Sequence, residues 1–124
     1  MTKIDFDICW IEMISDRPAD ASRFYADLFG WEAGEPEQTP MGPYFSHERG
    51  ERPGAGIMGK PAPEVQTGWK PYVRVPDLEE ALAKAQSLGA TVALPPMPIP
   101  NGSIIAVVQD PQGGEIGLLQ EPAQ

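Results

Sequence analysis

The stretch WKPYVRVPDLEEALAKAQSLG, residues 69–89, decides the fold class of this chain. Residues 69–75 are rich in β-branched and aromatic side chains and predict a strand, and Pro76 and Asp77 then mark the start of a helix. The apolar residues that follow recur at the spacing of one helix face: Leu78, Ala81, Leu82, Ala85 and Leu88. Gly89 stands where a left-handed cap ends a helix. The stretch therefore predicts a strand followed directly by a helix.

The same order occurs once more near the N-terminus. Residues 6–14 are rich in strand formers, and Pro18 fits the first turn of a helix, where its missing N–H costs nothing. Gly30 is the expected cap of that helix. Its apolar stripe is predicted to consist of Ala21, Phe24, Tyr25 and Leu28.

Each helix is followed by three short extended segments. The first set is expected to begin at Trp31 and to continue over residues 44–48 and 55–59; the second covers residues 91–94, 104–109 and 115–120. Residues 60–63 form a Pro-rich linker and residues 95–102 a structured loop. The fold class is therefore α+β, with two tandem βαβββ modules at about 5–60 and 68–121. The 124 residues make a single domain, 1–124, of ordinary size.

Charge and cysteine content limit the classes of partner. Lys and Arg number 9 and Asp and Glu 18, so the net charge is −9. Such a chain repels phosphates, which excludes nonspecific nucleic-acid binding and attraction to an anionic membrane. The single cysteine, Cys9, permits no internal disulfide, and neither a signal peptide nor an apolar run of membrane-spanning length is present. We expect a cytoplasmic protein.

Three segments resemble the vicinal oxygen chelate superfamily, which includes glyoxalase I, extradiol dioxygenases and bleomycin-resistance proteins. They are residues 24–31 (FYADLFGW), 75–81 (VPDLEEA) and 110–119 (DPQGGEIGLL). The resemblance implies a glyoxalase-like fold, in which curled mixed sheets from the two modules surround one cleft. It also implies a homodimer, because members of this length commonly pair.

Metal-dependent members of the superfamily place His and Glu ligands on the first and last strands of each module. The resemblance puts these positions at Trp10 (or Cys9, if the register slips by one), near Met58, at Lys70 and at Gly117. These residue types cannot rebuild the site, so we expect no metal and no other cofactor. The lone His47 falls off the ligand positions and is expected at the surface or at a sheet edge.

Strand alternation indicates which side chains face the cleft. Trp10, Glu12 and Ile14 share one face of the first strand, and Lys70, Tyr72 and Arg74 share one face of its counterpart. Ile11 and Met13 should face the helix. The predicted ligand-binding residues are Trp10, Glu12, Met58, Lys70, Tyr72, Arg74, Gly117 and Leu119. Aromatic walls with a few polar groups are typical of small-molecule sites.

Three interpretations remain open for these residues. In the first, Glu12 forms an ion pair across the cleft with Arg74 or Lys70, and Trp10 and Tyr72 fill the former metal cavity. Alternatively, the cleft binds a small organic molecule, as in the bleomycin-resistance group. In the third, the chain is a lyase- or isomerase-type enzyme related to lactoylglutathione lyase that acts on a small carbonyl compound. Glu12 or Tyr72 would then be the acid–base group, so whether the chain is an enzyme stays undecided.

Overall fold

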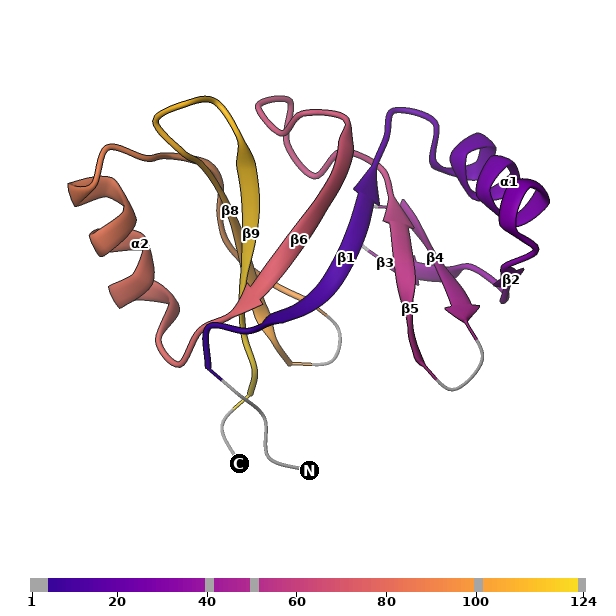
Figure 1. The fold of residues 1–124 in the computed structure, drawn as a ribbon, viewed down its shortest axis with the longest axis horizontal. Coiled ribbons are helices and arrows are strands. Elements are labelled where there is room, and N and C mark those ends of the chain that lie inside the picture. Colours follow the sequence, from indigo (N-terminus) through magenta and orange to yellow (C-terminus); the bar gives the residue numbers. More distant parts are fainter. Residues whose placement is uncertain (1–4, 40–41, 50–51, 100–101, 123–124) are drawn as a thin grey trace. The chain divides into compact units, whose positions relative to one another are not determined.

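The computed structural model of the chain describes residues 5–39, 42–49, 52–99 and 102–122. The chain divides into two compact units. The first unit comprises residues 10–70, and the second comprises the N-terminal residues up to Cys9 together with residues 71–124. Figure 1 traces both units and labels their elements. Each unit combines one helix with a mixed sheet, which confirms the α+β class and the repeated order of elements.

The first unit is built around strand β5. Strand β1 (Ile8–Ile14) runs parallel to β5 (Arg52–Met58), and β4 (Gly42–Arg49) pairs antiparallel with the other edge of β5. Two short strands, β2 (Glu32–Ala33) and β3 (Glu37–Thr39), pair antiparallel with β4. The pattern predicted extended structure from Trp31 onward but did not predict β3 as a separate strand.

Helix α1 (Pro18–Phe29) begins and ends as the sequence predicts. Proline occupies its first turn, and Gly30 ends it at φ 71°, a left-handed conformation that costs glycine nothing. The predicted apolar stripe, however, is not buried. Ser22 is the one buried residue of this helix, all of whose residues are described, while Phe24 and Leu28 are each 57% exposed. The apolar spacing along α1 therefore does not correspond to a buried face, and the aromatic side of α1 remains largely accessible.

In the second unit, helix α2 and a mixed sheet together form an aliphatic core. Strand β6 (Gly68–Arg74) runs parallel to β9 (Glu115–Gln120), and β8 (Ile104–Gln109) pairs antiparallel with both β9 and β7 (Thr91–Pro98). Helix α2 (Leu78–Ser87) begins at Asp77, whose side chain accepts a hydrogen bond of 3.1 Å from the backbone N–H of Glu80. This is the N-cap arrangement that satisfies an otherwise unpaired donor of the first turn.

Helix α2 buries the apolar stripe that residues 78–88 predict. Leu78 and Leu82 of the helix pack with side chains of β8, β9 and the β6–α2 junction in one cluster: Val75, Leu78, Leu82, Ala106, Val108 and Leu118. Leu88, the last residue of the predicted stripe, is 69% exposed. The two helices thus differ: α2 is fixed by aliphatic packing, whereas α1 is not.

One segment expected as a loop is a strand. Residues 95–98, which carry three of the chain's prolines, continue β7 instead of leaving it. Proline cannot donate to a sheet ladder, but β7 pairs with β8 on one side only and its register shifts between Val92 and Leu94 and again between Leu94 and Met97. Edge strands and bulges are the places where a sheet tolerates proline.

The structure also bears on membrane insertion. In the described part of the chain, no helix is long and apolar enough to span a bilayer.

Candidate functional site

A cluster of aromatic and acidic side chains lies on one face of the first unit's sheet. Glu12 of β1 pairs in register with Gly56 of β5, and Ile14 with Met58, so these residues share a face with Trp10. The indole N–H of Trp10 donates a hydrogen bond of 2.9 Å to the hydroxyl oxygen of Tyr44. Trp10, Glu12, Tyr44 and Gly56 are called the inner cluster below.

Tyr44 was missed by the sequence analysis, and Gly56 carries the signal that could have found it. A Cβ atom built on Gly56 would coincide with the hydroxyl end of Tyr44, so the tyrosine occupies the space that a side chain at position 56 would need. A glycine inside a strand often marks such a close approach. The glycine at position 56 is therefore explained by packing.

Burial affects the protonation state of Tyr44 in the inner cluster. The carboxyl group of Glu12 belongs to a residue that is only 4% exposed. Burial raises the pKa of Tyr44 above its ordinary value, and the nearby charge of Glu12 adds to that effect, against the opposing influence of the Trp10 hydrogen bond. Tyr44 therefore keeps its proton at neutral pH and can act as a neutral hydrogen-bond donor near the buried carboxyl group of Glu12.

The two other predicted residues of the first unit are also buried. Met58 is 3% exposed and Lys70 is 3% exposed. The Lys70 ammonium group donates a hydrogen bond of 2.9 Å to the backbone carbonyl of Gln66. A buried ammonium group needs such acceptors to offset its lost hydration, so this contact holds the cation on its strand.

In the second unit, the predicted residues Tyr72 and Gly117 lie directly against each other. They are partners in the parallel β6–β9 ladder, and Tyr72 is 1% exposed. A Cβ atom built on Gly117 would overlap three ring carbons of Tyr72. The aromatic ring therefore takes the space above position 117. Leu119, the next residue on that face of β9, pairs in register with Arg74.

Arg74 forms an ion pair and hydrogen bond with Glu121, a residue that the sequence analysis did not consider. The hydrogen bond to Glu121 raises the pKa of the Arg74 guanidinium above its ordinary value. Cys9 lies near Arg74, and its thiol donates a hydrogen bond to the backbone carbonyl of Tyr72, with a distance of 3.5 Å between sulfur and oxygen. Burial raises the pKa of the Cys9 thiol, so it is protonated at neutral pH and a poor nucleophile.

His47 does not lie at the surface or at a sheet edge, so that expectation is wrong. It is fully buried on the helix side of β4, and its Nε2 lies 2.7 Å from the hydroxyl oxygen of Ser22 on α1. Its Nδ1 has no hydrogen-bond partner among the described residues. Burial lowers the pKa of His47 below its ordinary value, so the imidazole is neutral at pH 7.

The side chains at the four positions that the resemblance assigns to metal ligands do not fit a divalent metal. The Trp10 indole N–H is a donor only, the Lys70 ammonium group is itself a cation, and Gly117 lies under the Tyr72 ring. The thioether of Met58 is a soft ligand that suits few of these ions. Within the described ranges, His, Cys, Asp and Glu side chains form no group of three that could hold a metal.

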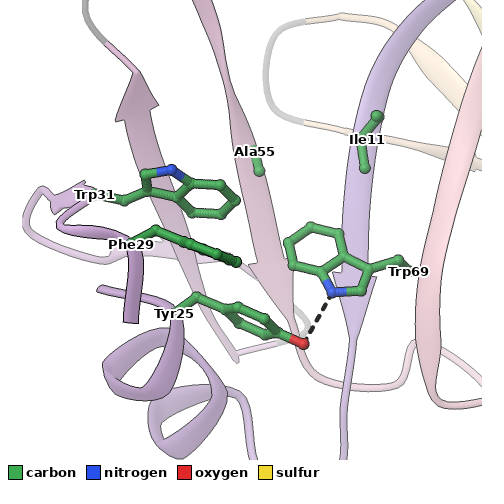
Figure 2. A pocket seen from close by; sticks show the side chains of 6 residues that line it. All are labelled: Ile11, Tyr25, Phe29, Trp31, Ala55 and Trp69. Carbon is green, nitrogen blue, oxygen red and sulfur yellow. Dashed lines mark hydrogen bonds between the residues drawn. The ribbon is translucent and has the colours of Figure 1, made fainter. Parts of the chain in front are cut away.

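A second feature lies on the opposite face of β1. Ile11 alternates with Trp10 and Glu12, and it lines an open cavity of about 270 Å³ between α1 and the sheet of the first unit. This cavity is called the aromatic pocket, and its lining residues are Ile11, Tyr25, Phe29, Trp31, Ala55 and Trp69. Figure 2 shows Trp31, Phe29 and Tyr25 layered on one side, with Trp69 facing them. The position of Ile11 agrees with the prediction that it faces the helix.

Comparison with known proteins identifies the fold and the relatives of this chain. The sequence profile described as a glyoxalase-like domain matches residues 10–119. A protein of Mycobacterium tuberculosis, CFP32, which carries a provisional name as a glyoxylase, is 31% identical over 117 residues, or 94% of this chain. Its counterpart in Mycobacterium bovis matches equally. The chain spans 45% of the length of these curated relatives.

Solved structures share the fold. Methylmalonyl-CoA epimerase from Mycobacterium tuberculosis superposes with a TM-score of 0.63 at 17% identity, covering 100% of this chain and 94% of the epimerase. A member of the glyoxalase/bleomycin resistance protein/dioxygenase superfamily from Vibrio splendidus gives 0.60 at 16% identity, with coverage of 90% and 97%. At these identities the likeness concerns the fold alone, and it confirms the glyoxalase-like fold that the sequence predicts.

Proposed function

Because this chain belongs to the glyoxalase-like family, we propose that it binds a small organic molecule through aromatic and polar side chains instead of a metal ion. The observation that carries the proposal is the pairing of a tyrosine with a glycine in each unit. Tyr72 covers Gly117, a ligand position by resemblance, and Tyr44 covers Gly56, the register partner of Glu12. At Gly117, an aromatic ring therefore occupies a position that the resemblance assigns to a metal ligand, and at Gly56 a second ring lies beside Glu12.

The inner cluster supplies groups of the kind that a carbonyl compound needs. The Trp10 ring offers a flat apolar wall, the Tyr44 hydroxyl a neutral donor, and Glu12 an acceptor. The ammonium charge of Lys70 favours a ligand that carries an anionic oxygen. A planar compound with an oxygen at one end matches this set, and its local contacts outweigh the distant negative charges, which salt screens beyond about 8 Å.

The test uses a matched pair of aryl carbonyl probes, benzoylformate and its neutral methyl ester, titrated by calorimetry. Trp10→Ala should weaken both probes at least tenfold, because both lose the stacking wall. Lys70→Met should weaken benzoylformate and leave the ester unchanged. Leu88→Ala, on an exposed side chain of the second unit, is the control. Wild-type affinity of both probes in Trp10→Ala would refute this site, and so would the absence of binding to the wild-type protein at millimolar concentration.

The alternative function, a lyase- or isomerase-type enzyme, is favoured by one observation. Glu12 is a buried carboxylate close enough to Tyr44 for its charge to influence that hydroxyl. A carboxylate beside a neutral donor can remove a proton next to a carbonyl while the donor stabilises the oxygen. Benzoylformate and its ester carry no such proton, so this test uses phenylpyruvate, whose methylene group lies next to the carbonyl. Exchange of its methylene protons for deuterium from heavy water above the uncatalysed rate, lost in Glu12→Gln and kept in Leu88→Ala, would establish catalysis. Binding of phenylpyruvate without such exchange would leave a binding protein.

The proposal includes a symmetric homodimer in the reducing cytoplasm. A twofold pair is the commonest oligomer, and a second copy would cover exposed sheet edges. A compartment that keeps thiols reduced agrees with a chain whose only cysteine is Cys9. Light scattering that gives the mass of one chain at micromolar concentration would refute the dimer.

A further inference from the structure

We propose that the aromatic pocket is a second binding site of the first unit, for a compound of one or two aromatic rings that carries no negative charge. This site lies on the face of β1 opposite the inner cluster and does not depend on the function proposed above. Its lining residues come from α1, β1, β5, β6 and the segment around Trp31.

The size of the pocket sets the size of the ligand. Its volume is about 270 Å³. A cavity of roughly 150 Å³ accommodates a benzene ring, and sites for drug-sized molecules start at about 300 Å³. The aromatic pocket therefore suits one substituted ring or a fused bicycle, and it is too small for a large polycyclic ligand.

The walls are held in place by contacts among themselves. The indole N–H of Trp69 donates a hydrogen bond of 3.0 Å to the hydroxyl of Tyr25, which ties β6 to α1 and is drawn in Figure 2. The Tyr25 ring lies 5.0 Å from the Trp69 ring in an edge-to-face arrangement, and Phe29 lies 5.0 Å from Trp31. Because these rings are already ordered, a ligand would bind without the usual cost of fixing flexible side chains.

The residues of the aromatic pocket leave apolar surface accessible to a ligand. Phe29 is 55% exposed, Ile11 43% and Trp69 37%, and the neighbouring Phe24 and Leu28 of α1 are exposed as well. Helix α2 of the other unit, in contrast, buries Leu78 and Leu82 in an aliphatic cluster. Contiguous apolar surface that stays open on a folded unit commonly marks a binding site.

Charge decides between ligand classes. The six lining residues are all uncharged, so a carboxylate placed among them would lose its hydration without gaining a cation as partner. A positive charge, in contrast, is attracted by the faces of tryptophan and tyrosine rings. The pocket therefore favours neutral or cationic aromatic compounds.

The experiment is a calorimetric titration of the full chain with three naphthalene probes that differ in one group: 2-naphthylmethanol, 2-naphthylmethylammonium and 2-naphthoate. We expect saturable binding of the alcohol and the ammonium compound and at least tenfold weaker binding of the carboxylate. Trp69→Ala removes one wall and should weaken the first two probes at least tenfold. Leu88→Ala, an exposed apolar residue of the second unit, should leave them unchanged.

A filling variant keeps the test valid if Trp69→Ala fails to fold. Ile11→Trp adds volume at a residue that is 43% exposed and lines the pocket, so it should block the probes while the thermal transition of the protein is retained. Probe binding that survives both Ile11→Trp and Trp69→Ala would overturn the proposal, as would equal affinity for 2-naphthoate or no saturable binding at all. A dimer that Phe24→Lys dissociates, together with absence of probe binding, would show instead that a second copy occupies this surface.

Discussion

Replacing Gly117 by alanine tests whether the Tyr72 ring fills the space above Gly117, the position that the resemblance assigns to a metal ligand. The added Cβ atom would overlap the ring carbons Cγ, Cδ2 and Cε2 of Tyr72. That ring is 1% exposed, so it cannot move aside into solvent. The backbone of Gly117 is not in a left-handed conformation, so the expected effect is steric only.

The magnitude follows from the cost of overpacking. Inserting a methyl group into a well-packed core destabilises a protein by about 1–3 kcal/mol, which we expect for Gly117→Ala. With Tyr72→Ala in the background, the ring and its Cγ atom are gone. The same alanine should then cost nothing, or even stabilise the strand by about 0.5–1 kcal/mol, because glycine loses more backbone entropy on folding. The two changes should therefore couple by about 1–4 kcal/mol.

The assay is urea unfolding of the wild type, both single variants and the double variant. Gly34→Ala is the control, since an added Cβ there meets nothing within 4 Å; it should lie between no change and about 1 kcal/mol of stabilisation. A Gly117→Ala variant as stable as the wild type, or effects of the two changes that simply add, would refute the packing of Tyr72 over position 117.

Three further predictions concern His47, Asp77 and Cys9. Burial lowers the pKa of His47 in the folded state, so its contribution to stability is complete above the unfolded pKa of about 6.5 and is lost as the pH falls below that value. Between pH 7.5 and 5.5, the free energy of unfolding measured in urea should therefore fall more in the wild type than in His47→Gln. Equal decreases in the two proteins would contradict a buried neutral imidazole. Asp77→Ala removes the cap on the N–H of Glu80 and should destabilise the protein by about 1 kcal/mol, with Asp77→Ser close to wild type; a cost below about 0.3 kcal/mol would exclude the cap. Because burial raises the pKa of Cys9, its alkylation by iodoacetamide at pH 7.5 should be slower than that of a free cysteine peptide, and a faster rate would show a thiolate.

The sequence predicted elements that depend on local chemistry. Proline in the first turn, a capping aspartate and glycines at helix ends act through their own backbone, so α1 and α2 begin and end where these residues stand. The edge position of β7 could not be read from its prolines, because tolerance of proline depends on which strand lies beside it. The local pattern of residues 95–98 favoured a loop, but pairing with β8 makes them part of strand β7.

Part of the candidate site could be predicted in the same way. Alternation along β1 placed Trp10 and Glu12 on one face and Ile11 on the other. Tyr44, Glu121 and the Ser22–His47 pair were missed, since each meets its partner through tertiary contacts between residues 25 to 47 positions apart. The aromatic pocket was missed for a related reason: residues 24–28 show the spacing of a buried stripe, and spacing alone does not reveal that the helix leaves that stripe open.

The most direct measurement is a calorimetric titration of metal-depleted, tag-free protein with Ni²⁺, Zn²⁺ and Mn²⁺, followed by elemental analysis of the dialysed samples. Trp10, Met58, Lys70 and Gly117 do not provide the donors of a divalent site, and a tyrosine ring covers the last of these positions. We predict no saturable binding and far less than one ion per chain. Binding of about one ion per chain at micromolar affinity, retained in His47→Gln and lost in Glu12→Gln, would contradict the proposal that aromatic packing has replaced the metal.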